Sequence, residues 1–178
     1  MQRPQFNFPK KIEEIIRVNY VGEYGAVRIY EGQISGCAAS EAREEIVKMK
    51  SQEEIHLAYF SDQMKKRNIR PSIMMGLWHK FGFALGHITS SNMKMSMICT
   101  ESIETEIEKH YQSQIEFLNE SSKEQELKKY IKKFQLEEIE HKEIASDQID
   151  NKLSVFEGVS SLLIKQLCRI AIKISKKI

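Results

Sequence analysis

Residues 46–64, IVKMKSQEEIHLAYFSDQM, carry a glutamate and a histidine on the apolar face of a predicted helix. Steps of three and four residues trace that face, whose other members are Ile46, Met49, Phe60 and Met64, with His56 or Leu57 at one step. Side chains at this spacing share one side of a helix. Glu53 and His56 are therefore predicted to point into the core as a Glu-x-x-His pair.

The same pattern returns in residues 127–148, LKKYIKKFQLEEIEHKEIASDQ. The inward stripe predicted here is Leu127, Ile131, Phe134, Glu138, His141, Ala145 and Gln148. Glu137 and Glu140 fall on other faces, where we expect them to meet solvent. A long helix followed by a helix with Glu-x-x-His thus occurs twice, as duplication of a helical hairpin would produce.

Two further predicted helices each place one glutamate in mid-length on an apolar face. The first stripe is Ile12, Ile16, Asn19, Glu23, Ala26 and Tyr30. The second is Met93, Met97, Thr100, Glu104, Ile107 and Tyr111. Glu108 lies close to the face of Glu104, and spacing alone leaves the choice between these two open.

Glutamates that face one another in a core need a compensating positive charge, because a buried carboxylate is costly unless it is paired or binds a metal. The four stripes contain no Lys or Arg, whereas two divalent cations would balance four carboxylates and leave two imidazoles to complete the coordination. The pattern predicts a dinuclear site with the ligands Glu23, Glu53, His56, Glu104, Glu138 and His141. Ferritin-like di-iron bundles use this ligand order. The alternative is that the helix faces are misphased by one residue and the glutamates meet solvent.

The composition predicts an all-α chain, because three prolines and eight glycines leave long stretches rich in Glu, Lys and Ile. Helices are predicted over residues 10–37, 40–67, 91–119, 123–151 and 155–177. The second opens near a capping-box-like Ser40 and ends before the breaker at residues 68–71. With 178 residues, we expect a single domain, 1–178, built as a ferritin-like four-helix bundle with apolar accessory segments.

Charge and cysteine content exclude several classes of protein. The 27 Lys and Arg against 25 Asp and Glu give a net charge of +2, which argues against a general nucleic-acid binder. Three widely spaced cysteines fit neither a disulfide framework nor a zinc ribbon. Residues 1–9 carry no secretory or transit signal, so we expect synthesis in a bacterial cytoplasm.

Two apolar segments lie outside the predicted four-helix core. Residues 73–99 lack acids and combine Trp78 with Phe, Met and interrupting glycines, a composition that suits a membrane interface. Residues 162–178 also lack acids and place Lys165, Arg169 and Lys173 opposite leucines and isoleucines, which is typical of a basic helix on a membrane surface. The alternative for the second segment is a terminal helix that docks on the bundle with a solvated basic rim.

The other histidines, His79, His87 and His110, have no glutamate three residues before them and are expected to pack rather than to bind metal. His110 and Tyr111 follow Glu104 by six and seven residues. Because metal ligands commonly need outer partners, we expect these two to contact the ligands or the substrate.

The stretch Arg17–Ala26, RVNYVGEYGA, followed by Ile29–Gln33, IYEGQ, strongly resembles the demethoxyubiquinone hydroxylases of ubiquinone biosynthesis. Further segments agree in order and spacing, namely QEEIHL at 52–57, Arg70-Pro71, Leu77-Trp78, GFALG at 82–86, Cys99-Thr100, His110-Tyr111, and IKKF at 131–134 with EEIEH at 137–141. The likeness covers the chain from about residue 12 onward. One departure is Tyr20-Val21, where the family usually has His-Ala, and it leaves all six ligands intact.

The resemblance implies that the six residues bind two iron ions, with Glu53 and Glu138 bridging, and it favours Glu104 over Glu108. It also implies O2-dependent hydroxylation of 2-polyprenyl-3-methyl-6-methoxy-1,4-benzoquinol (demethoxyubiquinol), the penultimate step towards ubiquinone, with a reductant such as NADH. We expect the ring to enter between the helices at 10–37 and 91–119, where Gly22 and Gly25 leave room.

The implied location is the cytoplasmic side of a bacterial cell membrane, as a peripheral protein that takes a substrate with an isoprenoid tail. A homo-oligomer and contacts with other ubiquinone-biosynthesis proteins are further expectations, and no nucleic acid is expected. The alternative function is that of a ferritin-like protein that handles iron or scavenges peroxide, and a helical membrane scaffold without metal is a third.

Overall fold

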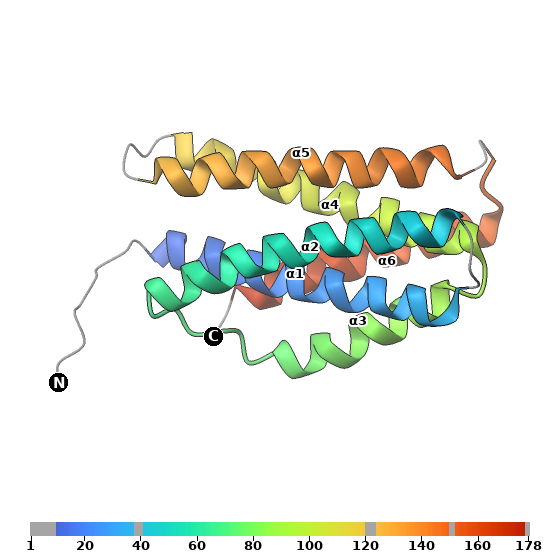
Figure 1. Cartoon of the computed structure of the whole chain (residues 1–178), viewed down its shortest axis with the longest axis horizontal. Helices are drawn as coiled ribbons and strands as arrows, with labels where there is room; N and C mark the ends of the chain where they lie inside the picture. The colour runs from blue at the N-terminus through green and yellow to red at the C-terminus, as the bar shows by residue number, and fades with distance from the viewer. Residues whose placement is uncertain (1–9, 38–40, 120–123, 150–151, 177–178) are drawn as a thin grey trace.

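The computed structural model describes residues 10–37, 41–119, 124–149 and 152–176, and in these residues it contains six α-helices and no strand (Figure 1). The helices are α1 (Lys10–Gly36), α2 (Glu41–Lys66), α3 (Met75–Thr89), α4 (Met93–Asn119), α5 (Gln125–Asp147) and α6 (Val155–Ser175). The all-α class is confirmed, and the predicted helix ends agree within a few residues. Ser40 lies outside the described residues, so its capping role stays a prediction.

Four long helices, α1, α2, α4 and α5, form the centre of the molecule. One apolar cluster joins the start of α1 to the ends of α2 and α4 and to the start of α5. A second joins Tyr30 of α1 to Ile46 and Met49 of α2, Met97 of α4 and Ala145 of α5. These pairings make α1 antiparallel to α2 and to α4, so α2 and α4 run in the same direction. The chain must therefore cross the length of the bundle between them, and α3 makes this crossing.

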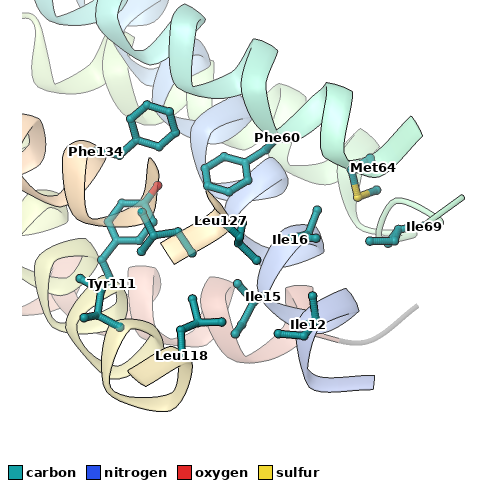
Figure 2. Close-up of a cluster of buried hydrophobic side chains, with 12 residues drawn as sticks. Ile12, Ile15, Ile16, Phe60, Met64, Ile69, Tyr111, Leu118, Leu127 and Phe134 are labelled. Atoms are coloured by element: carbon teal, nitrogen blue, oxygen red, sulfur yellow. The ribbon is translucent and has the colours of Figure 1, made fainter. Parts of the chain in front are cut away.

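The first cluster fills one end of the bundle (Figure 2). Phe60 from α2, Phe134 from α5 and Tyr111 from α4 meet Ile12, Ile15 and Ile16 of α1 there. All six side chains are at most 2% exposed. With apolar clusters at both ends, the middle of the bundle is left for the polar side chains that the stripes predicted.

The turn after α2 ends that helix at Asn68, the one described non-glycine residue with positive φ, 54°. The amide of Ile69 donates to the carbonyl of Met64 at 2.9 Å, and the amide of Asn68 donates to Lys65 at 3.2 Å. This pair of bonds is a Schellman motif, and Ile69 and Met64 also share the apolar cluster, as that motif favours. The breaker predicted at residues 68–71 is confirmed.

Helix α3 packs on α1 through glycines of the segment for which the sequence pattern predicts a membrane interface. A Cβ atom on Gly86 would overlap the backbone of Ile29, and one on Gly32 would overlap the backbone of Phe83. Only glycine permits such an approach of two helices. Gly82 also faces α1, at Gly25 and Arg28, whereas Gly76 has open space around it.

Helix α6 docks on α4, as the alternative for this segment predicts, but part of its basic face pairs with acids of α4 and does not form a solvated rim. Arg169 donates to both oxygens of Glu106, at 2.7 and 2.9 Å, and Lys165 lies 3.2 Å from Glu101. The Arg169 guanidinium lowers the pKa of Glu106 to about 2. The apolar face of α6 instead turns outward, with Phe156 and Leu163 at 72% and 60% exposure. The basic residues Lys165 and Arg169 are thus not the free membrane-facing charges that the sequence pattern predicts.

Within the described residues, no helix combines the length and the apolar character that crossing a membrane requires.

Candidate metal centre

The six residues singled out in the sequence lie together between the two apolar clusters. Each is at most 4% exposed, in the order Glu23, Glu53, His56, Glu104, Glu138 and His141 along the chain. The stripe phases predicted for α1, α2, α4 and α5 at these positions are therefore confirmed. Glu108, the alternative to Glu104, is partly exposed and pairs with Lys142 of α5.

The donor atoms form two overlapping groups, each with its atoms within 4.8 Å of one another. Glu23, Glu53, His56 and Glu138 form the first group. Glu53, Glu104, Glu138 and His141 form the second. Because Glu53 and Glu138 belong to both groups, they lie where carboxylates shared by two cations would lie.

Both histidines present Nδ1 to the carboxylates and bind an outer acceptor with Nε2. His141 Nε2 lies 2.7 Å from Gln52 Oε1, and His56 Nε2 lies 2.9 Å from Glu137 Oε2. An imidazole that donates its proton at Nε2 keeps a lone pair at Nδ1, the form that coordinates a metal. The outer acceptors thus favour the tautomers in which both Nδ1 atoms are available as ligands.

The hydrogen-bond geometry within the second group also fits a cation. Nδ1 of His141 lies 3.1 Å from Glu53 Oε1 and 3.3 Å from Glu138 Oε2. Yet all three atoms are buried without a hydrogen-bond partner among the described residues. Buried polar atoms are normally paired, so atoms that converge without pairing fit a shared metal ion.

The electrostatics of the protein without metal also favour a bound cation. Burial, followed by the charges of Glu138 and Glu53, raises the pKa of Glu104 well above its usual value. Burial lowers the pKa of His141, but the same two carboxylates outweigh that effect and raise it to about 11. Negative charge is thus in excess at this centre, and a divalent cation would compensate it.

Two tyrosines hold the glutamates that come from α1 and α4. The hydroxyl of Tyr30 on α1 donates to Glu104 on α4 at 3.1 Å, and the hydroxyl of Tyr111 on α4 donates to Glu23 on α1. The contact expected for Tyr111 is therefore present. His110 instead lies 2.7 Å from Gln114, which bonds Asn19, so the structure gives it no direct contact with the glutamates among the described residues.

A cleft of about 810 Å³, measured to its open mouth, leads from the surface to the carboxylates. Its walls come from α1, α3, α4 and α6, and Glu23, Glu53, Glu104 and Glu138 lie at its inner end. Gly22 and Gly25 line it, and a Cβ atom on either would have no neighbour within 4 Å. Apart from the glutamates, its lining is apolar except for Trp78, Cys168 and Ser175. A cleft with this apolar lining suits an aromatic ring with an apolar substituent.

Comparison with known proteins identifies the family. Residues 10–175 match the family described as ubiquinone biosynthesis protein COQ7. The human protein named NADPH-dependent 3-demethoxyubiquinone 3-hydroxylase, mitochondrial, is 40% identical over 170 residues, which cover 94% of this chain and 78% of the human one. The chain belongs to the COQ7 family.

Other members of the COQ7 family extend this similarity to bacteria and yeast. The Rhodospirillum rubrum protein named 3-demethoxyubiquinol 3-hydroxylase is 37% identical over 169 residues, which cover 94% of this chain and 78% of that protein. The Saccharomyces cerevisiae protein named 5-demethoxyubiquinone hydroxylase, mitochondrial, is 31% identical over 183 residues, with the same coverage of both chains. The family resemblance stated from the sequence motifs is confirmed.

For several residues around the centre of this COQ7 family member, the sequence did not predict the observed position or contact. Glu137 was predicted to meet solvent, but it binds His56 across the α2–α5 interface. Gln52 binds His141 across the same interface. Gln148 was predicted to point inward but is exposed beyond the end of α5. Helical spacing indicates which side chains share a face, but it does not reveal which outer acceptor a neighbouring helix brings into reach.

Proposed function

We propose that this chain is a ferritin-like di-iron protein whose ligands are Glu23, Glu53, His56, Glu104, Glu138 and His141. Glu53 and Glu138 would bridge the two ions, because each belongs to both groups of converging donors. The supporting observation is the set of buried carboxylate and imidazole atoms that converge without hydrogen bonds. The order of ligands along four helices matches that of di-iron carboxylate bundles.

The function that this site supports best is the O2-dependent hydroxylation of demethoxyubiquinol at its unsubstituted ring carbon. The names of the human and Rhodospirillum rubrum relatives state a hydroxylation of this kind for those proteins. Iron, when bound, supplies the activation of O2. The single observation that carries the proposal for this chain is the apolar cleft, which ends on four of the six proposed ligands.

The protein's own part in the reaction is to bind the ring, to orient the imidazoles and to shield the centre from water. Val21 of α1 and Ile103 of α4 both line the cleft, and apolar walls exclude water from the ring and the carboxylates. Gln52 and Glu137 hold the two imidazoles in their orientation. We propose NADH as the reductant, as the family resemblance implies. The name of the human relative specifies NADPH.

The first experiment combines iron analysis with chromatography of quinones. Reduced protein is given O2 and a demethoxyubiquinol with a short isoprenoid tail, and the wild type is compared with Glu138→Ala and Glu140→Ala. Glu140 is the matched control because it is an exposed glutamate of the same helix. We expect two irons per chain and a hydroxylated product in the wild type and in Glu140→Ala, and the loss of both in Glu138→Ala. Two irons without product would favour an iron-handling or peroxide-scavenging protein, and no iron would reject the site.

We also propose that the protein binds peripherally to the cytoplasmic face of a bacterial membrane. Phe81 of α3 and Leu167 of α6 line the cleft and are each 39% exposed, so apolar surface surrounds its mouth. The same two helices also expose Ile88 and Leu163, at 70% and 60%. A substrate could then keep its isoprenoid tail in lipid while the ring enters the cleft. A homo-oligomer and contacts with other ubiquinone-biosynthesis proteins stay predictions.

Sedimentation with anionic liposomes tests this orientation. Leu163→Ser and Ile88→Ser should each reduce the bound fraction, because exposed apolar area contributes about 25 cal/mol per Å² when it enters lipid. Leu136→Ser is the control, since Leu136 is 67% exposed on α5, away from the cleft. If all three variants sediment like the wild type, the cleft mouth is not the membrane contact.

A further inference from the structure

The cleft holds two polar atoms that nothing in the described part of the chain satisfies. They are Nε1 of Trp78 and Oγ of Ser175, both buried and without a hydrogen-bond partner among the described residues. Both residues line the cleft, whose walls are otherwise apolar apart from the proposed metal ligands and Cys168. Buried polar groups in folded proteins are nearly always bonded, so each exception needs an explanation.

Neighbouring contacts hold both side chains in place. Trp78 packs edge-on against Phe81, with ring centroids 6.2 Å apart, and the adjacent His79 lies 2.5 Å from the Tyr24 hydroxyl. Ser175, the last residue of α6, is 2% exposed, and Arg17 of α1 donates to the carbonyl of the next residue, Lys176. The two unpaired atoms therefore belong to ordered walls on different helices.

An aromatic substrate with oxygen substituents would explain them. The ring of a benzoquinol is flat and apolar on both faces, and its hydroxyl and methoxy oxygens project from the edge. An indole N–H can only donate a hydrogen bond, whereas a serine hydroxyl can donate or accept. Polar groups at a few fixed points of an apolar pocket are what orients a ligand of this kind.

We propose that Trp78 and Ser175 form the subsite that binds the ring oxygens and thereby selects which ring carbon faces the glutamates. This inference rests on the proposed function and adds two positioning residues to it. Both residues act on the substrate and not on the metal. A ring bound without these contacts could rotate within its plane, and its unsubstituted carbon would no longer be held towards the centre.

The test measures binding to the metal-loaded, full-length protein in its resting state. Isothermal titration calorimetry compares a 1,4-benzoquinone that carries methoxy groups and a decyl chain with decylbenzene, which has the chain but no ring oxygens. The variants are Trp78→Phe, which removes the N–H but also part of the indole, and Ser175→Ala, which removes the hydroxyl with little change of shape; decylbenzene binding reports the effect of shape alone. Ser161→Ala is the matched control, because Ser161 is a buried serine of the same helix that bonds Ser102 outside the cleft. Since Trp78 is the single tryptophan, quenching of its fluorescence reports independently on quinone binding in Ser175→Ala.

We expect each of the two variants to weaken quinone binding about five- to tenfold, the effect of losing one hydrogen bond, and to leave decylbenzene binding within about twofold. Unchanged quinone affinity in both variants would overturn the subsite while the hydroxylase proposal stands. An equal loss for both ligands would also overturn it, since shape and not hydrogen bonding would then be responsible. A wild type that binds no quinone would reject the proposed function and the subsite together.

Discussion

Tyr30 and Tyr111 each donate a hydrogen bond to a glutamate on the other tyrosine's helix. Each tyrosine also follows the glutamate of its own helix by seven residues. Tyr30 of α1 donates to Glu104, and Tyr111 of α4 donates to Glu23. Because α1 and α4 are antiparallel, two equal spacings in sequence become two crossed hydrogen bonds in space. This relationship agrees with the internal repeat of helical hairpins that the sequence indicates.

Removal of the Tyr30 hydroxyl should destabilise the protein. Tyr30→Phe leaves Glu104 without this donor in a buried site, and we expect a loss of about 1–3 kcal/mol in the free energy of unfolding. Urea denaturation of the metal-free protein measures it. Tyr59→Phe is the matched control, because the Tyr59 hydroxyl is buried without a partner among the described residues. Equal stability of the two variants would show that the bond to Glu104 contributes nothing.

Glu137 should contribute to metal affinity although it is not one of the six proposed ligands. Glu137→Ala frees Nε2 of His56 and removes the contact that orients its ring. Loss of such an outer partner typically lowers metal affinity about 10–100-fold. Competition with a chelator measures the change. The exposed Glu140 gives the control, Glu140→Ala, and a Glu137→Ala protein that retains iron as firmly as this control would contradict the role.

Gly86→Ala should disrupt the contact between α3 and α1. Its added methyl group would overlap the Ile29 backbone, so we expect destabilisation of about 1–3 kcal/mol and a distorted cleft. Thermal unfolding and quinone binding report the two effects. Gly76→Ala changes the same helix where a Cβ has open space, and it should be neutral or stabilise by up to about 1 kcal/mol. A harmless Gly86→Ala would mean that α3 does not pack closely on α1.

His110 should make stability depend on pH in the mildly acidic range. Burial, followed by the charges of Lys176 and Lys11, lowers its pKa from 6.5 to about 4. Between these values the unfolded chain binds a proton that the folded chain does not. Stability is therefore lost as the pH falls from 6.5 towards 4, by up to about 3 kcal/mol from this residue.

His110→Gln tests this effect in the metal-free protein. The variant should lose less stability than the wild type when urea denaturation at pH 7 is compared with pH 4.5. Other groups that titrate in this range are common to both proteins and cancel in the difference. The same loss in both proteins would show that His110 is accessible to protons in the folded state.

The sequence predicts the centre of this protein better than its periphery. Glu53 and Glu138 were placed inward by periodicity alone, because a charged residue within an apolar stripe has few structural explanations. The surroundings of Lys165 and Arg169 were predicted wrongly, because a basic stripe has the same sequence spacing whether it faces lipid headgroups or the acids of α4. The close contact of Gly86 with α1 likewise depends on which helix lies opposite, and no local pattern contains that information.

Cys168 lines the cleft, and burial, more than the nearby charge of Glu104, raises the pKa of its thiol to about 12. Quinones with an unsubstituted ring carbon are electrophiles that add thiolates, and the thiolate is the reactive form of cysteine. At pH 7 such a thiol is almost entirely un-ionised. A sulfur atom can therefore line this cleft without being alkylated when the ring is present in its oxidised, quinone form, so the low polarity that admits the substrate also protects the protein from it.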